Sequence, residues 1–105
     1  MASVLKDAGR VLSVGCGSGL FEKILRDERG IDIRNGIEPS EGMAAIARNR
    51  GMDVTVAKAE DADFGTNDYD TILFNGTPSY IAPLAEVIAK AFAALPEGGR
   101  IILID

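Results

Sequence analysis

Short apolar runs alternate along this chain with longer stretches in which apolar residues recur every three or four positions. Residues 10–14 form the first run, which is β-branched and typical of a strand. The next stretch has helical spacing and stops at Gly30; its apolar residues are Leu20, Phe21, Ile24 and Leu25. The pattern predicts one strand followed by one helix.

A second strand and helix are predicted between residues 31 and 51. Residues 31–37 alternate as in a strand that Asn35-Gly36 interrupts, and Glu38 ends it before Pro39. Ser40 is typical of a helix N-cap, and Gly51 closes the helix that follows. The predicted inner face of this helix consists of Met43, Ile46 and Ala47.

The second half of the chain repeats the alternation. Residues 54–56, 70–74 and 100–104 are predicted strands, and residues 60–63 are an acidic loop. Residues 72–74 are apolar enough for a strand covered on both faces. The cleanest amphipathic helix is predicted before residues 96–99, with an apolar face of Leu84, Val87, Ile88, Ala91, Phe92 and Leu95. Strand and helix therefore alternate throughout, which predicts an α/β fold with a parallel sheet and helices on both faces.

Composition narrows the possible functions. The chain has 105 residues, enough for a single domain over residues 1–105, and its net charge of −5 argues against a nucleic-acid partner. The basic cluster at residues 48–50 is interpreted as a helix C-terminus. No apolar run is long enough to span a membrane and no secretion signal is recognised, so we expect a cytoplasmic protein. A single cysteine and no histidine exclude Cys-His catalysis and histidine-containing metal sites, so no metal is expected.

The run of residues 11–19, VLSVGCGSG, is the most informative chemical feature. A strand, a glycine-rich turn and a helix in that order form a cradle for a nucleotide-like ligand, because glycine removes the Cβ that would block close approach. Glu38 lies at the carboxyl end of the second predicted strand, where a carboxylate accepts hydrogen bonds from ribose hydroxyls. A tight structural turn and a solvated carboxylate are the alternative interpretations.

Two further polar positions follow predicted strands at the same edge. In the acidic stretch of residues 60–63 a carboxylate could accept a bond from an adenine amino group, or the stretch is simply a solvated loop. Asn75 could face a ligand carboxylate or carbonyl, although as a turn former before Gly76 it needs no function. Tyr80 is a candidate cover of the pocket, or a packing residue.

These segments resemble the class I S-adenosylmethionine-dependent methyltransferases, most closely their small-molecule, type 11-like branch. The matching segments are residues 11–19, 36–43, 59–62, 69–74 and 95–100, so the resemblance covers nearly the whole chain. It implies a Rossmann-like doubly wound parallel sheet of about five strands in the order 3-2-1-4-5. It also implies S-adenosylmethionine as the cofactor and a small molecule as the methyl acceptor.

The resemblance assigns roles to individual residues. Gly15 and Gly17 would lie under the methionine and ribose parts of the cofactor, Glu38 would bind the ribose, and Asn75 would lie near the methyl group. The residues around the adenine would be Glu60, Asp61 and Ala62. The remaining cofactor-binding residues would be Cys16, Gly19, Pro39 and Met43. No residue is assigned as a catalytic base.

The chain departs from the family pattern in two places. The family commonly has an acid two positions before the first glycine, which helps to fix the methionine portion of the cofactor, and Ser13 occupies that place here. The chain also stops at Asp105, without the last two strands of the full family fold, which implies a fragment of a longer enzyme or a minimal cofactor-binding core. Residues 100–104 would then form an apolar edge strand, for which we expect self-association.

Three functions remain open on the sequence alone. The first is a methyltransferase acting on a small molecule, or its cofactor-binding core. The second is a noncatalytic module that keeps the fold to bind the cofactor or a partner. The third is a NAD-dependent oxidoreductase domain, although the Gly-x-Gly-x-Gly spacing fits the methyltransferases better than it fits nicotinamide enzymes.

Overall fold

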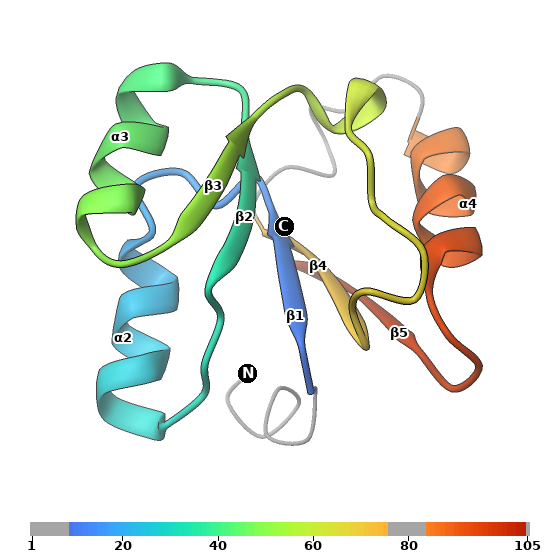
Figure 1. Ribbon diagram of the computed structural model, residues 1–105, viewed down its shortest axis with the longest axis horizontal. Helices are drawn as coiled ribbons and strands as arrows, with labels where there is room; N and C mark the ends of the chain where they lie inside the picture. Colours follow the sequence, from blue (N-terminus) through green and yellow to red (C-terminus); the bar gives the residue numbers. More distant parts are fainter. Residues whose placement is uncertain (1–8, 76–83, 105) are drawn as a thin grey trace.

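Five parallel strands form one sheet in the order β3-β2-β1-β4-β5. This computed structural model describes residues 9–75 and 84–104 (Figure 1). The strands are β1 (Val11–Val14), β2 (Asn35–Glu38), β3 (Asp53–Val56), β4 (Thr71–Asn75) and β5 (Arg100–Ile104). The predicted fold class and strand order are confirmed. The order reverses between β1 and β4, which is where ligands bind in sheets of this kind.

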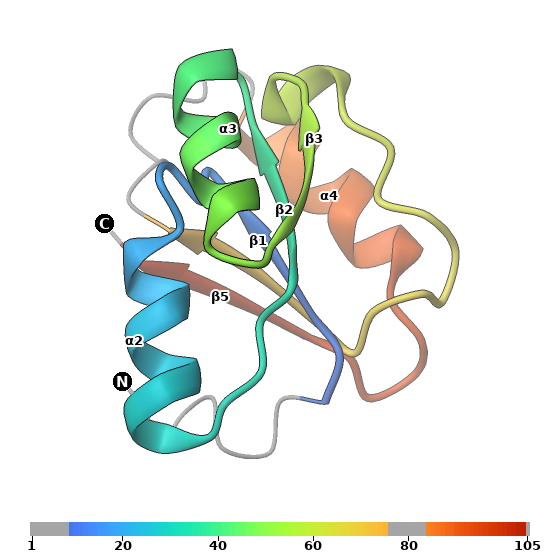
Figure 2. The ribbon, with the colours of Figure 1, turned by 60° about the vertical axis from the view of Figure 1, so that its left-hand side comes forward.

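Helices cover both faces of the sheet. They are α2 (Leu20–Arg29), α3 (Glu41–Asn49) and α4 (Leu84–Ala94), together with a short 3₁₀ helix, η1 (Ala59–Asp61). Helices α2 and α3 lie on one face and α4 lies on the other (Figures 1 and 2). The predicted helix ends are confirmed at Ser40, whose Oγ accepts a hydrogen bond from the Met43 N–H, and at Gly30, which caps α2 with a φ of 67°.

Strand β4 is buried on both faces, as the sequence predicts. Ile72 and Phe74 pack in the core under α4, whereas Leu73 packs with Leu25 under α2. All three β4 side chains are fully buried. Successive strand residues point to opposite faces, so one strand supplies both cores and holds the two helical layers in place.

The predicted inner face of α3 is wrong in part. Met43 and Ile46 are 45% and 44% exposed, and the buried residues of α3 are Ala44 and Ala47. Both alanines pack with Cys16, in a cluster that also contains residues of β3 and the turn before it. Their small side chains let α3 approach the glycine-rich turn closely, and that approach rotates the two longer side chains outward.

The predicted inner face of α4 also needs one correction. Phe92 is 67% exposed, and the buried residues of α4 are Val87, Ala91 and Ala94. These three follow the i, i+4, i+7 spacing of a single helical stripe, and Phe92 lies one residue, or about 100°, away from it. The prediction placed Phe92 on the apolar face by its helical spacing, but the buried stripe is narrower than predicted and leaves Phe92 outside it.

Two predicted segments differ in extent. The second strand is limited to Asn35–Glu38, so Asn35 and Gly36 start the strand and do not interrupt it. Gly36 is required there because a Cβ would lie 2.8 Å from the Cys16 Sγ. The acidic segment at residues 60–63 is partly helical, since η1 spans its first two residues. The loop after Asn75 lies outside the described residues, as does Tyr80.

Candidate cofactor-binding site

The glycine-rich turn joins β1 to α2 at the carboxyl edge of the sheet. The N–H groups of Gly15 and Cys16 both donate to the Ile37 carbonyl, at 2.7 and 3.3 Å, which ties the turn to β2. The Arg50 guanidinium donates to the carbonyl and the hydroxyl of Ser18, both at 2.8 Å, which ties the turn to the end of α3. The turn is therefore held from two sides, and its backbone is positioned before any ligand binds.

Two glycines of this turn differ in their surroundings. Both have a positive φ, 58° at Gly17 and 75° at Gly19. A Cβ at Gly17 would meet nothing within 4 Å, so the space above this residue is open. A Cβ at Gly19 would lie 2.9 Å from the Met52 Sδ and 3.1 Å from the Ala47 Cβ. Gly17 thus offers bare backbone to a ligand, whereas Gly19 lets α2 start against α3.

Glu38 links the end of β2 to the glycine-rich turn. Its side chain is 8% exposed; Oε1 accepts from the Gly17 N–H at 3.0 Å and Oε2 from the Ser40 N–H at 2.9 Å. Each carboxylate oxygen has two lone pairs, so each can accept one more hydrogen bond. The two backbone bonds fix the carboxylate beside the open space at Gly17. This arrangement fits a ligand with neighbouring hydroxyl groups.

Cys16 is buried within the same turn. Its Sγ lies 3.7 Å from the Gly17 carbonyl. Burial, followed by the negative charges of Glu22 and Glu38, raises the pKa of this thiol to about 12. The thiol is therefore protonated at neutral pH and is not a nucleophile. With 5% of its surface exposed, Cys16 packs in this turn as a small apolar residue.

The structure adds a residue that the sequence analysis missed. Glu22, in the first turn of α2, is 1% exposed. Its Oε2 accepts from the Ser13 hydroxyl at 2.7 Å and lies 3.5 Å from the Asn75 Nδ2. The sequence contained a sign of this burial, because Glu22 and the buried Leu25 are three residues apart and therefore share one helix face. A second sign is Ser13, a polar residue within an apolar strand, whose hydroxyl needs a buried partner such as Glu22.

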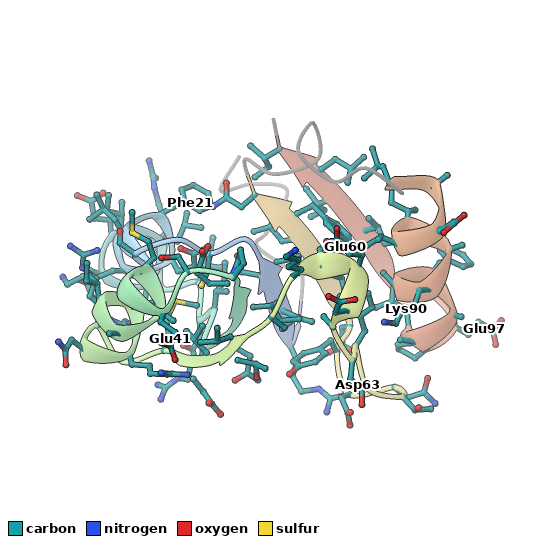
Figure 3. All side chains as sticks on the ribbon, turned by 90° about the horizontal axis from the view of Figure 1, so that it is seen from above. Phe21, Glu41, Glu60, Asp63, Lys90 and Glu97 are labelled. Carbon is teal, nitrogen blue, oxygen red and sulfur yellow. The ribbon has the colours of Figure 1, made fainter. Side chains whose placement is uncertain are left out.

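The other predicted residues lie around this carboxyl edge, which Figure 3 views from above. Pro39 is exposed at the end of β2, and Met43 is exposed in the first turn of α3. Glu60 and Asp61 are exposed on η1, and Figure 3 shows Glu60 well apart from Glu41 at the start of α3. Asn75 ends β4, next to β1.

Ala62 differs from its acidic neighbours. Its side chain is 3% exposed and packs in the core under α4. The Lys90 ammonium donates to the Ala62 carbonyl and lies 5.4 Å from the centre of the Phe64 ring. The backbone after η1 is thereby anchored to α4, on which Figure 3 labels Lys90.

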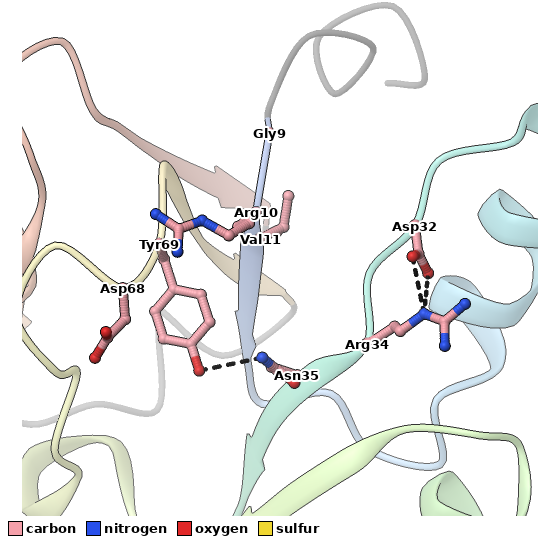
Figure 4. A pocket seen from close by; sticks show the side chains of 8 residues that line it. All are labelled: Gly9, Arg10, Val11, Asp32, Arg34, Asn35, Asp68 and Tyr69. Atoms are coloured by element: carbon pink, nitrogen blue, oxygen red, sulfur yellow. Dashed lines mark hydrogen bonds and ion pairs between the residues drawn. The ribbon is translucent and has the colours of Figure 1, made fainter.

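A hollow of about 430 Å³ lies at the opposite, amino edge of the sheet (Figure 4). Its Arg34 and Asp32 form an ion pair at 2.8 Å, and its Asn35 donates to the Tyr69 hydroxyl at 3.3 Å. Burial, together with nearby acidic residues, raises the pKa of Tyr69. These side chains satisfy one another, and the hollow lies away from the glycine-rich turn, so we place the site at the carboxyl edge.

Within residues 9–75 and 84–104, no three His, Cys, Asp or Glu side chains are grouped so as to hold a metal ion. Over the same residues no helix has the length and apolar character that crossing a bilayer requires.

Comparisons with known proteins identify the family of the chain. Residues 1–105 match a family model described as a methyltransferase domain. An uncharacterized protein of Methanocaldococcus jannaschii is 36% identical over 95 residues, which are 90% of this chain and 43% of that protein. Trans-aconitate 2-methyltransferase of Variovorax paradoxus is 30% identical over 97 residues, which are 90% of this chain and 38% of that enzyme.

A solved structure from Thermotoga maritima, described as a methyltransferase dependent on S-adenosylmethionine and a possible histamine N-methyltransferase, superposes with a TM-score of 0.82. It is 32% identical to this chain, and the match covers 96% of this chain and 46% of that one. The chain therefore spans less than half the length of each of these three proteins.

Proposed function

The chain belongs to the class I S-adenosylmethionine-dependent methyltransferase domain family, and we propose that it binds this cofactor along the glycine-rich turn for methyl transfer to a small molecule. In this proposal the adenosyl group lies over Gly17, the ribose hydroxyls donate to Glu38, and the adenine lies toward η1. The carboxyl end of β4, at Asn75, borders the methyl group.

The contact between Gly17 and Glu38 carries the proposal. One hydrogen bond of 3.0 Å brings the bare backbone of the turn and a fixed carboxylate to the same point. Open space above Gly17 admits a flat or ring-shaped group, and the unused lone pairs of Glu38 accept from a diol. A ribose within an adenosyl group has both properties, so the residues fit the cofactor of the family.

The residues also suit the chemistry. When bound, S-adenosylmethionine would supply a methyl group on a sulfonium, and the neutral thioether of S-adenosylhomocysteine is a good leaving group. The protein's contribution is then mainly to hold the acceptor and the methyl group in line, which requires positioned backbone and little acid or base help. A chain without histidine is compatible with this requirement.

A small molecule is the acceptor class that the chain favours. The net charge of −5 disfavours a polyanionic acceptor such as nucleic acid. Two of the related proteins carry names that specify small acceptors, trans-aconitate in one and histamine, as a possibility, in the other. These two acceptors have opposite charges, so the proposal specifies the size class alone.

Titration calorimetry with S-adenosylmethionine, S-adenosylhomocysteine and NAD tests the binding step. We expect the chain to bind the first two and not NAD. Glu38→Ala should weaken binding of both about 10- to 100-fold, because charge-assisted hydrogen bonds to the ribose are lost. Glu97→Ala removes the same charge from an exposed turn before β5 and should leave binding unchanged. Preference for NAD, or no binding at all, would refute the proposal.

Transfer is tested separately, by incubating the chain with S-adenosylmethionine and either trans-aconitate or histamine and measuring S-adenosylhomocysteine. Product formation with either acceptor supports an enzyme of small molecules. Binding without turnover on a wider panel of small acids and amines favours the noncatalytic cofactor-binding module.

A further inference from the structure

Among the residues that the structure describes, the buried carboxylate of Glu22 has a partner for only one of its two oxygens. Oε2 accepts from the Ser13 hydroxyl, but Oε1 is buried without a hydrogen-bond partner among the described residues. Glu38 is the contrasting case, because both of its oxygens accept backbone N–H groups. A buried carboxylate with an unused oxygen is costly, and proteins keep one where a cation or a donor completes it.

No cationic side chain of the described residues completes Glu22. Lys23 and Arg26, the neighbouring cations on α2, both form ion pairs with Asp27 on the exposed side of the helix. The N-terminus of α2 favours a negative charge at this position but supplies no hydrogen bond to Oε1. The group that completes Glu22 Oε1 is therefore not one of the described residues.

The position of Glu22 in the fold points to a ligand. Ser13 precedes the glycine-rich turn on β1, and Asn75 ends β4, the strand paired with β1. Both side chains reach the Oε2 of Glu22, at 2.7 and 3.5 Å. The carboxylate thus lies between β1 and β4, where the strand order reverses. Ligands of doubly wound sheets bind in the crevice at this point.

We infer that Glu22 binds the α-ammonium group of the cofactor's methionine portion and replaces, from helix α2, the acid that the family commonly carries at the position of Ser13. This inference rests on the proposed cofactor. The Ser13 hydroxyl orients the carboxylate by donating to Oε2, which leaves Oε1 to accept from the ammonium. Glu22 and Glu38 then hold opposite ends of one ligand, the amino acid and the ribose.

The unaltered chain provides the first test. Calorimetry compares S-adenosylhomocysteine with its desamino analogue, in which hydrogen replaces the α-amino group. The inference predicts that the analogue binds about 10- to 100-fold more weakly, since a charge-assisted hydrogen bond is lost. Equal affinity would overturn it. If neither compound binds, the proposed function itself fails, and the two failures are thereby distinguished.

A variant provides the second test and separates ligand binding from a structural role. Glu22→Gln should weaken S-adenosylhomocysteine about 10- to 100-fold but leave 5′-methylthioadenosine unchanged, because the latter lacks the amino acid portion. Glu28→Gln, an exposed change on the same helix, should alter neither. If Glu22→Gln weakens both ligands alike, Glu22 only supports the fold and the inference is wrong. If that variant does not fold, the comparison on the unaltered chain still decides.

Discussion

Substituting alanine at Gly17 and at Gly19 should separate the ligand-facing part of the glycine-rich turn from its packing part. Both residues have a positive φ, so alanine pays a similar backbone cost of about 1–2 kcal/mol at each. At Gly17 the added methyl meets nothing within 4 Å. At Gly19 it lies 3.3 Å from the Ala47 Cα, which is helix backbone and cannot move aside. Overpacking of this kind costs about 1–3 kcal/mol more.

Urea unfolding measures this difference. Gly19→Ala should unfold at a midpoint about 1 M lower than Gly17→Ala, taking a denaturant slope of roughly 1–3 kcal/mol per M. Calorimetry with S-adenosylhomocysteine should show the reverse order, because a methyl at Gly17 occupies the space that the adenosyl group needs. Equal midpoints would refute the packing role of Gly19. Unchanged affinity in Gly17→Ala would refute the placement of the ligand.

Three further predictions follow from burial and edge exposure. The unfolding free energy should fall as pH rises from 9 toward 12, because burial raises the pKa of the Cys16 thiol from its ordinary value of 9.0 to about 12 in the folded chain. The fall should be smaller in Cys16→Ala, as urea unfolding at several pH values will show, and an identical slope would contradict the buried-thiol assignment. Phe92→Ala should change the free energy of unfolding by less than about 0.5 kcal/mol, whereas Val87→Ala on the same helix should lower it by about 2 kcal/mol. Similar losses in thermal unfolding of the two variants would contradict the observed face of α4. If the open edge of β5 mediates self-association, Leu103→Lys should lower the mass found by light scattering at high concentration, and a monomer before substitution would argue against that contact.

The order of strands and helices could be predicted from the sequence because each element has a distinct apolar period and a clear boundary residue. Gly30 and Ser40 mark helix ends by local backbone chemistry, which does not depend on the rest of the fold. The buried run of β4 likewise indicated an inner strand. Local signals therefore sufficed for the topology.

The faces of α3 and α4 could not be predicted with the same success. Which side of a helix is buried depends on how closely it approaches its neighbours, and Ala44 lies inside, where it packs in one cluster with Cys16. Met43 is larger and more apolar, so composition favoured it. The distance between α3 and the glycine-rich turn, which the sequence does not show, leaves Met43 outside and Ala44 inside.

The site was predicted in part for a similar reason. The glycine-rich turn and Glu38 are adjacent to strand ends, so the topology alone brings them together. Glu22 lies on α2, and its carboxylate reaches the same edge of the sheet. Its burial depends on the hydrogen bond with Ser13 of β1, a contact between two separate elements. A charged residue within an apolar helix face is the signal that would have found it.

A crystal structure of the chain with S-adenosylhomocysteine tests the central claim most directly. The account predicts the adenosyl group over Gly17, with both ribose hydroxyls within hydrogen-bond distance of the Glu38 carboxylate. Density for the ligand in the hollow beside Tyr69, at the opposite edge of the sheet, would contradict it.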